Sequence, residues 1–210
     1  MLFSAVVSAI IFILVNYAWI LMFTQADGQT LSQRGFASLK YFTVLSNLLM
    51  GFAALVHLIC SIQVLRKKTE KVPEWAEQLF YTGTTAVSLT FGMVMVYLGP
   101  IFGYGKLLEN FQLYLHLFVP VLSILTLCLL HRERVITQKD SFTALFPLFF
   151  YGIYYLEMIF RFGLDRPKAD WYYLAVGGMK SIPFVFLLIV LCTWGIALML
   201  RLAVNGIKRK

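Results

Sequence analysis

The chain has 210 residues, of which 60% are hydrophobic and 13% are charged. A soluble domain of this length would carry about twice that share of charged residues, so the composition excludes an ordinary water-soluble domain. The formal net charge of +8 would suit a nucleic-acid partner, but the basic residues gather in short connectors between apolar stretches. That placement argues against a nucleic-acid-binding surface.

Six apolar stretches follow one another along the chain, each long enough to cross a bilayer, which takes about 20 residues of α-helix. They cover residues 2–24, 36–65, 76–100, 107–130, 142–163 and 171–202. The connectors between them leave no room for a soluble domain. The sequence therefore predicts one all-α domain over residues 1–210, a bundle of six transmembrane helices in an integral membrane protein.

Basic residues cluster after the second and fourth stretches and at the end of the sequence. The clusters are Arg66, Lys67, Lys68 and Lys71; Arg132, Arg134 and Lys139; and Lys208, Arg209 and Lys210. In a six-span protein all three lie on one side, which the positive-inside rule makes cytoplasmic. We therefore expect both the N-terminus and the C-terminus in the cytoplasm, with the clusters meeting anionic lipid headgroups.

Two prolines fall inside the predicted spans at informative places. Pro120 has no amide hydrogen, so in an α-helix it frees the carbonyl four residues earlier, that of His116. Pro183 does the same for Met179. The sequence predicts a kink in the outer half of the sixth span.

Four different spans carry a polar or charged side chain in the outer half of the bilayer. At a rise of 1.5 Å per residue, the depths below the outer boundary are roughly 10 Å for Thr43, 13 Å for His116, 9 Å for Glu157 and 13 Å for Lys180. Polar groups in lipid are costly and tend to face the interior of a bundle. We therefore expect these four side chains to form one polar layer.

Helical spacing adds neighbours on the same faces. The pairs are Thr43 with Asn47, Gln112 with His116, and Glu157 with Arg161, the last spaced as an ion pair, while Ser46 lies about one residue step around the helix from Thr43 and Asn47. Each residue alone has a structural explanation, such as a hydroxyl bonded to the preceding turn or an interhelical amide. Their shared depth is what favours a functional site.

Around Thr43 and His116 the sequence resembles the androgen-induced-gene type of intramembrane threonine hydrolases and the related bacterial proposed six-transmembrane proteins. The matching stretches are YFTVLSNLLMG, which contains Thr43, and NFQLYLHLFVPVL, in which His116 precedes Pro120. The resemblance implies a hydrolase of lipid (fatty-acid) esters, with Thr43 as nucleophile, His116 as base and a membrane lipid as substrate. It also implies a location in the bacterial cytoplasmic membrane.

Five residues are expected to support the substrate or the oxyanion: Ser46, Asn47, Gln112, Glu157 and Lys180. Asn47 and Lys180 are the best oxyanion donors, and Glu157 would orient His116 or neutralise Lys180. No cofactor and no metal are expected, because no ligand spacing appears.

Two other functions stay open. One is a non-enzymatic scaffold or lipid-binding protein, in which the polar layer only specifies how the helices pack. The other is a small transporter or channel, against which stand the lack of internal repeats and of polar groups continuing into the inner half.

Overall fold

The computed structural model describes residues 1–24, 35–130, 134–164, 169–175 and 177–208. Over these residues the chain is mainly helical and forms no strand, and six helical segments are long and apolar enough to cross a membrane. The predicted all-α fold with six spans is confirmed. Three members of the predicted basic clusters, Arg132, Arg209 and Lys210, lie outside the described residues.

The first three spans are α1 (Leu2–Thr24), α2 (Phe42–Leu65) and α3 (Glu74–Met93). A short 3-10 helix, η1 (Gly35–Lys40), precedes α2. The third span is extended by the π-helix η2 (Val94–Leu98) and by α4 (Gly99–Phe102), after which α5 (Tyr104–Leu107) folds back.

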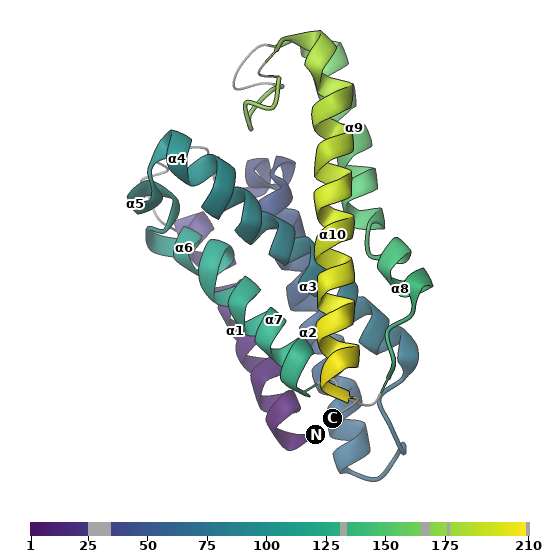
Figure 1. The fold of residues 1–210 in the computed structure, drawn as a ribbon. Helices are drawn as coiled ribbons and strands as arrows, with labels where there is room; N and C mark the ends of the chain where they lie inside the picture. Colours follow the sequence, from purple (N-terminus) through teal and green to yellow (C-terminus); the bar gives the residue numbers. More distant parts are fainter. Residues whose placement is uncertain (25–34, 131–133, 165–168, 176, 209–210) are drawn as a thin grey trace.

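The fourth span consists of α6 (Asn110–Leu113), the π-helix η3 (Tyr114–Phe118) and α7 (Val119–Leu130). The fifth combines α8 (Gln138–Thr143) with α9 (Phe146–Phe162), and the sixth is α10 (Ile182–Lys208), preceded by the 3-10 turn η4 (Met179–Ser181). Both ends of the chain lie at one end of the bundle (Figure 1), which we call the terminal end; the opposite end is the far end.

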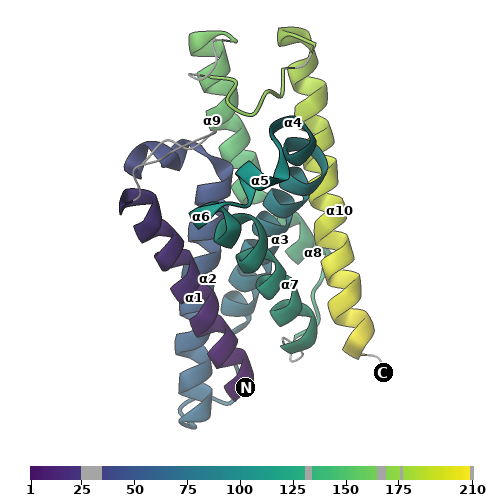
Figure 2. The ribbon, with the colours of Figure 1, turned by 90° about the vertical axis from the view of Figure 1, so that its left-hand side faces the viewer.

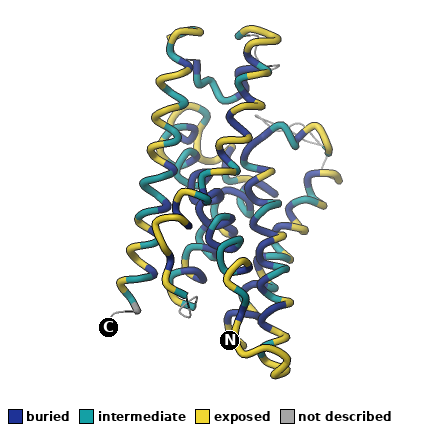
Figure 3. The backbone as a smooth tube through the Cα atoms, turned by 90° about the vertical axis from the view of Figure 1, so that its right-hand side faces the viewer, coloured by how far each residue is buried: buried dark blue, intermediate teal, exposed yellow. Residues whose placement is uncertain are grey.

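Small residues bring the central helices together, as is usual where packing rather than water drives association. A side chain added at Gly51 of α2 would begin 2.9 Å from Val15 Cγ1 of α1, and one at Gly83 of α3 would begin 3.1 Å from Met50 Sδ. Buried positions run through the centre, while the periphery is exposed (Figure 3). Exposed side chains on α10 include Phe184, which suits contact with lipid.

The predicted kink in the sixth span is wrong. Pro183 is the second residue of α10, and Pro147 is likewise the second residue of α9. A proline is tolerated in the first turn because its missing N–H would have no partner there. The sixth span therefore begins at the proline, later than the sequence indicated, and residues 169–175 lie outside it.

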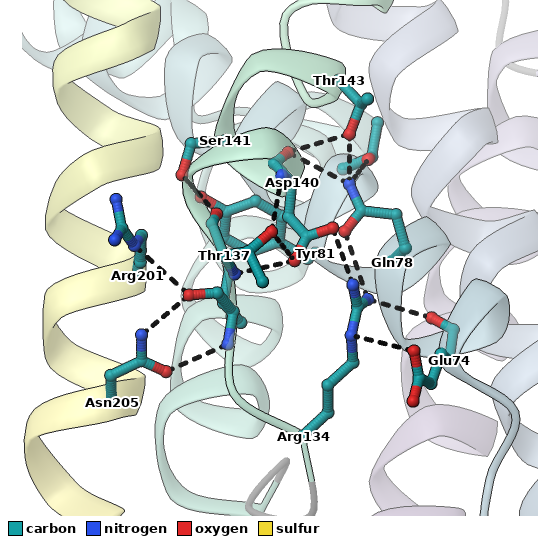
Figure 4. Close-up of polar contacts among 12 residues, drawn as sticks. Glu74, Gln78, Tyr81, Arg134, Thr137, Asp140, Ser141, Thr143, Arg201 and Asn205 are labelled. Carbon is teal, nitrogen blue, oxygen red and sulfur yellow. Dashed lines mark hydrogen bonds and ion pairs between the residues drawn. The ribbon is translucent and has the colours of Figure 1, made fainter.

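A polar network fixes residues 134–143 between α3 and α10 at the terminal end (Figure 4). The Arg134 guanidinium donates to Asp140 Oδ1 at 2.7 Å and to the Glu74 carbonyl at 3.1 Å. From α10, Asn205 donates to the Ile136 carbonyl and accepts from the Ile136 N–H. These contacts account structurally for the buried charge of Asp140 and for the half-buried Arg134 beside it.

Candidate functional site

His116 lies within the π-helix η3, and Pro120, four residues later, explains why the helix is π rather than α at this point. The Val119 N–H bonds to the Tyr114 carbonyl, five residues back. In this register the carbonyl that Pro120 would have to serve is that of Leu115, not that of His116 as expected for an α-helix. Such π segments occur frequently at functional sites.

The orientation of the His116 ring is set by the end of α5. His116 Nδ1 lies 2.6 Å from the Leu107 carbonyl, one of the last carbonyls of α5, which have no partner within that helix. Because a carbonyl oxygen only accepts, Nδ1 carries the proton and donates. In the neutral ring Nε2 then keeps a lone pair, which is what a general base needs.

Thr43 is the second residue of α2, and the polar residues that follow it serve mainly the backbone. Asn47 donates to the Thr43 carbonyl at 2.7 Å and to the orphaned Leu115 carbonyl at 3.1 Å. Ser46 Oγ lies 3.1 Å from the Thr43 carbonyl and 2.9 Å from Thr90 Oγ1 on α3. Both amide hydrogens of Asn47 are thus engaged, which leaves none for an oxyanion.

Residues 169–175 form a non-helical plug that dips between the far ends of α9 and α10 (Figure 2). Asp170 is fully buried and accepts from the Tyr155 hydroxyl at 2.5 Å and from the Leu174 N–H at 2.8 Å. The Tyr172 hydroxyl accepts from the Thr43 N–H at 3.4 Å and interacts with the Thr43 side chain. The plug therefore reaches the first turn of α2.

Burial raises the pKa of Tyr172 above its usual value. The phenol accordingly stays protonated at neutral pH and keeps a hydrogen to donate. The sequence alone did not predict a role for Tyr172, and its one local signal is Asp170, an acidic residue directly before the aromatic stretch WYYL.

Thr43 and His116 line the same cavity, of about 50 Å³, together with Gln112 and Tyr172. Gln112 is buried one turn before His116, as the spacing predicted. Among the described residues no hydrogen bond joins the Thr43 and His116 side chains, and the Gln112 amide has no protein partner. Four polar side chains thus meet in a space suited to small groups such as a water molecule.

A fifth polar group lies close by without a partner. Asn47 Oδ1 is buried and accepts no hydrogen bond from the residues that the structure describes. A buried acceptor of this kind is costly unless water or a ligand satisfies it. It marks the first turns of α2 as a place with unused hydrogen-bonding capacity.

Glu157 and Lys180 do not reach this cavity. Glu157 is exposed on α9 and Lys180 is exposed in η4, ahead of the sixth span rather than inside it. The expected Glu157–Arg161 ion pair is not formed, and the Arg161 guanidinium carbon lies 5.9 Å from the Phe162 ring centroid instead. The predicted layer thus holds two of its four members, Thr43 and His116.

Lys40 provides the positive charge nearest to the site along the chain. Its ammonium lies 5.1 Å from the Tyr41 ring centroid and 5.2 Å from that of Trp171 in the plug, and burial lowers its pKa.

Groups of three or more His, Cys, Asp or Glu residues that could hold a metal ion are absent from the described part of the chain. Comparisons of the chain with models of known families, with characterised proteins and with solved structures find no match.

Proposed function

We propose that the protein is an intramembrane hydrolase that cleaves lipid esters, with Thr43 as nucleophile and His116 as general base. The observation that carries the proposal is that the two side chains line one cavity while the Leu107 carbonyl holds the His116 ring with Nε2 free to accept a proton. A threonine hydroxyl is a weak nucleophile until a base takes its proton. A neutral imidazole supplies that base near pH 7.

In the first half-reaction the Thr43 oxygen attacks the ester carbonyl while its proton moves to His116 Nε2. The tetrahedral intermediate collapses, the bond to the leaving alcohol breaks, and the alcohol takes the proton from His116. In the second half-reaction His116 deprotonates a water molecule, which attacks the acyl-threonine and releases the fatty acid. One ester and one water thus yield one acid and one alcohol.

The oxyanion of each tetrahedral intermediate needs donors. Gln112 and Tyr172 are the candidates that the cavity offers, since both line it. The Gln112 amide is without a partner among the described residues, and the Tyr172 phenol stays protonated. They replace Asn47 and Lys180 in this role, because the Asn47 hydrogens are engaged and Lys180 lies elsewhere.

The test is labelling of membranes with fluorophosphonate probes of several acyl lengths, which react with activated hydroxyl nucleophiles. We expect Thr43→Ala to abolish labelling and His116→Ala to slow it by about 10²–10⁴-fold. The matched control is Thr84→Ala, which removes a buried threonine that bonds to the Phe80 carbonyl away from the cavity; it should label like the wild type. Purified protein that is labelled by no probe and cleaves no lipid ester would refute the proposal.

A scaffold or lipid-binding role is the second candidate, and the hydrogen bonds of Ser46 and Asn47 favour it, since both residues serve helix packing. The two functions differ in what Thr43→Ala changes. A scaffold would tolerate Thr43→Ala, because the Thr43 side chain makes no hydrogen bond to the described residues of α3 or α7. A lipid-binding protein would retain bound lipid in that variant while never releasing fatty acid.

A further inference from the structure

Three hollows lie in series, from the Thr43 cavity to the side of the bundle. The cavity that holds Thr43 and His116 shares Thr43, Leu98 and Tyr172 with a second, apolar cavity of about 60 Å³. That inner cavity shares Phe42 and Tyr151 with a third hollow of about 270 Å³ between α2 and α9. We call the third hollow the side groove.

The side groove faces the surface that would meet lipid. Leu45 is 36% exposed, Tyr154 37% and Phe150 68%, and all three line the groove. The described residues that form its walls include no charged side chain. An ion or a charged headgroup would find no opposite charge in those walls, whereas a hydrocarbon chain would meet mainly apolar and aromatic surface.

Two aromatic rings separate the side groove from the inner cavity. The ring centroids of Phe42 and Tyr151 are 5.1 Å apart. Tyr151 is anchored, since its hydroxyl donates to the Lys40 carbonyl at 2.8 Å and accepts from Trp171 Nε1 at 3.1 Å. The Phe42 ring has no polar atom to anchor it, so it is the half of the barrier able to rotate.

We propose that the side groove binds the acyl chain of the ester substrate, which enters from the bilayer between α2 and α9 and passes the Phe42 ring to present its carbonyl to Thr43. Lipid tails gain no hydrophobic free energy by leaving a bilayer for an apolar groove. Selection among chains therefore arises from shape, and the volume of the groove limits chain length and branching. The inference rests on the proposed hydrolase function, which it extends to the substrate's path.

The experiment is photocrosslinking in nanodiscs with a long-chain acyl ester whose chain ends in a diazirine, using the non-hydrolysing Thr43→Ala chain. We expect crosslinks on residues 42–49 and 147–154. An unlabelled ester at roughly ten times its dissociation constant should reduce them about tenfold. Crosslinks to Phe184, on the lipid-facing side of α10, should not respond to the competitor, since they report bulk lipid.

Two variants sharpen the test. Leu49→Trp fills the groove and should remove the competed crosslinks, whereas the matched Leu191→Trp, on the exposed face of α10, should leave them. Phe42→Ala opens the barrier, and the probe should then reach Met93 in the inner cavity. That second variant keeps the proposal testable if Leu49→Trp fails to fold.

The inference is overturned if groove crosslinks resist competition, if both tryptophan variants behave alike, or if the groove crosslinks to a second copy of the chain. Failure of the hydrolase proposal looks different. In that case fluorophosphonates label nothing and lipid esters stay intact, while competed crosslinks in the groove persist.

Discussion

The bond from Asn47 to the Leu115 carbonyl should depend on Pro120, and this dependence is open to measurement. In the π register of η3, Pro120 is placed to serve the Leu115 carbonyl but has no hydrogen to give, so Asn47 supplies it from α2. Pro120→Ala restores a backbone donor, whether the helix keeps the π register or relaxes to α. In that background the Asn47 bond becomes redundant.

The magnitude follows from the groups involved. Interhelical hydrogen bonds in membranes average about 0.6 kcal/mol, while a buried carbonyl left without a donor costs about 1–3 kcal/mol. Asn47→Ala also removes the unpartnered Oδ1, which offsets part of the loss. We expect Asn47→Ala to cost about 1–2 kcal/mol with Pro120 present and about 0.5 kcal/mol in the Pro120→Ala background, hence a coupling of about 1 kcal/mol.

The assay is a double-mutant cycle on reversible unfolding in mixed micelles of mild detergent and SDS, followed by loss of helicity. Thr193→Ala serves as control, since its hydroxyl bonds to the Ile189 carbonyl within α10 and should add to Asn47→Ala without coupling. If the effects of Asn47→Ala and Pro120→Ala on the free energy of unfolding add within about 0.3–0.5 kcal/mol, then Asn47 does not replace the donor that Pro120 lacks.

Three further predictions concern packing, the plug and the oxyanion. In the same unfolding assay, Gly51→Ala should destabilise the protein by about 1–3 kcal/mol, because the new Cβ meets the stiff, buried Val15 side chain at 2.9 Å. Gly92→Ala, with open space around it, should not destabilise it. Asp170→Ala should cost about 1–3 kcal/mol, since it strands the backbone donors of the plug, and thermal unfolding with unchanged midpoint would contradict this. Gln112→Ala should slow fluorophosphonate labelling by about 10²–10³-fold at unchanged thermal stability; unchanged labelling would remove Gln112 from the oxyanion site.

The six spans were predictable because length and hydropathy suffice to recognise a transmembrane helix. That Thr43 and His116 line one cavity agrees with the similar depths inferred for them in the sequence, although His116 lies in a π-helix and not in the regular α-helix that was assumed. Lys180 was misplaced because the stretch after Asp170 is apolar and was counted as helix. Hydropathy measures composition and does not distinguish a helix from an extended plug held by a buried carboxylate.

Glu157 was misplaced for another reason. Depth along a helix says nothing about rotation, and α9 turns Tyr151 and Tyr155 inward while Glu157 faces out. The spacing of Tyr151 and Tyr155 was available in the sequence, but aromatic residues suit a lipid face as well as a core. The partners of the two tyrosines reveal which face is buried, since the Tyr155 hydroxyl donates to Asp170 and the Tyr151 hydroxyl to the Lys40 carbonyl.

Irregular backbone at membrane depth must find its hydrogen bonds within the protein, and this requirement sorts the polar residues of the far end into two groups. Asn47 and Asp170 serve carbonyls and amides that η3 and the plug leave open. Thr43 and Gln112 use no side-chain hydrogen for that purpose and line the cavity instead. Substitutions of Asn47 and Asp170 should therefore lower stability whatever the function. Substitutions of Thr43 and Gln112 should change fluorophosphonate labelling alone. A cavity that serves only packing would not separate the two groups in this way.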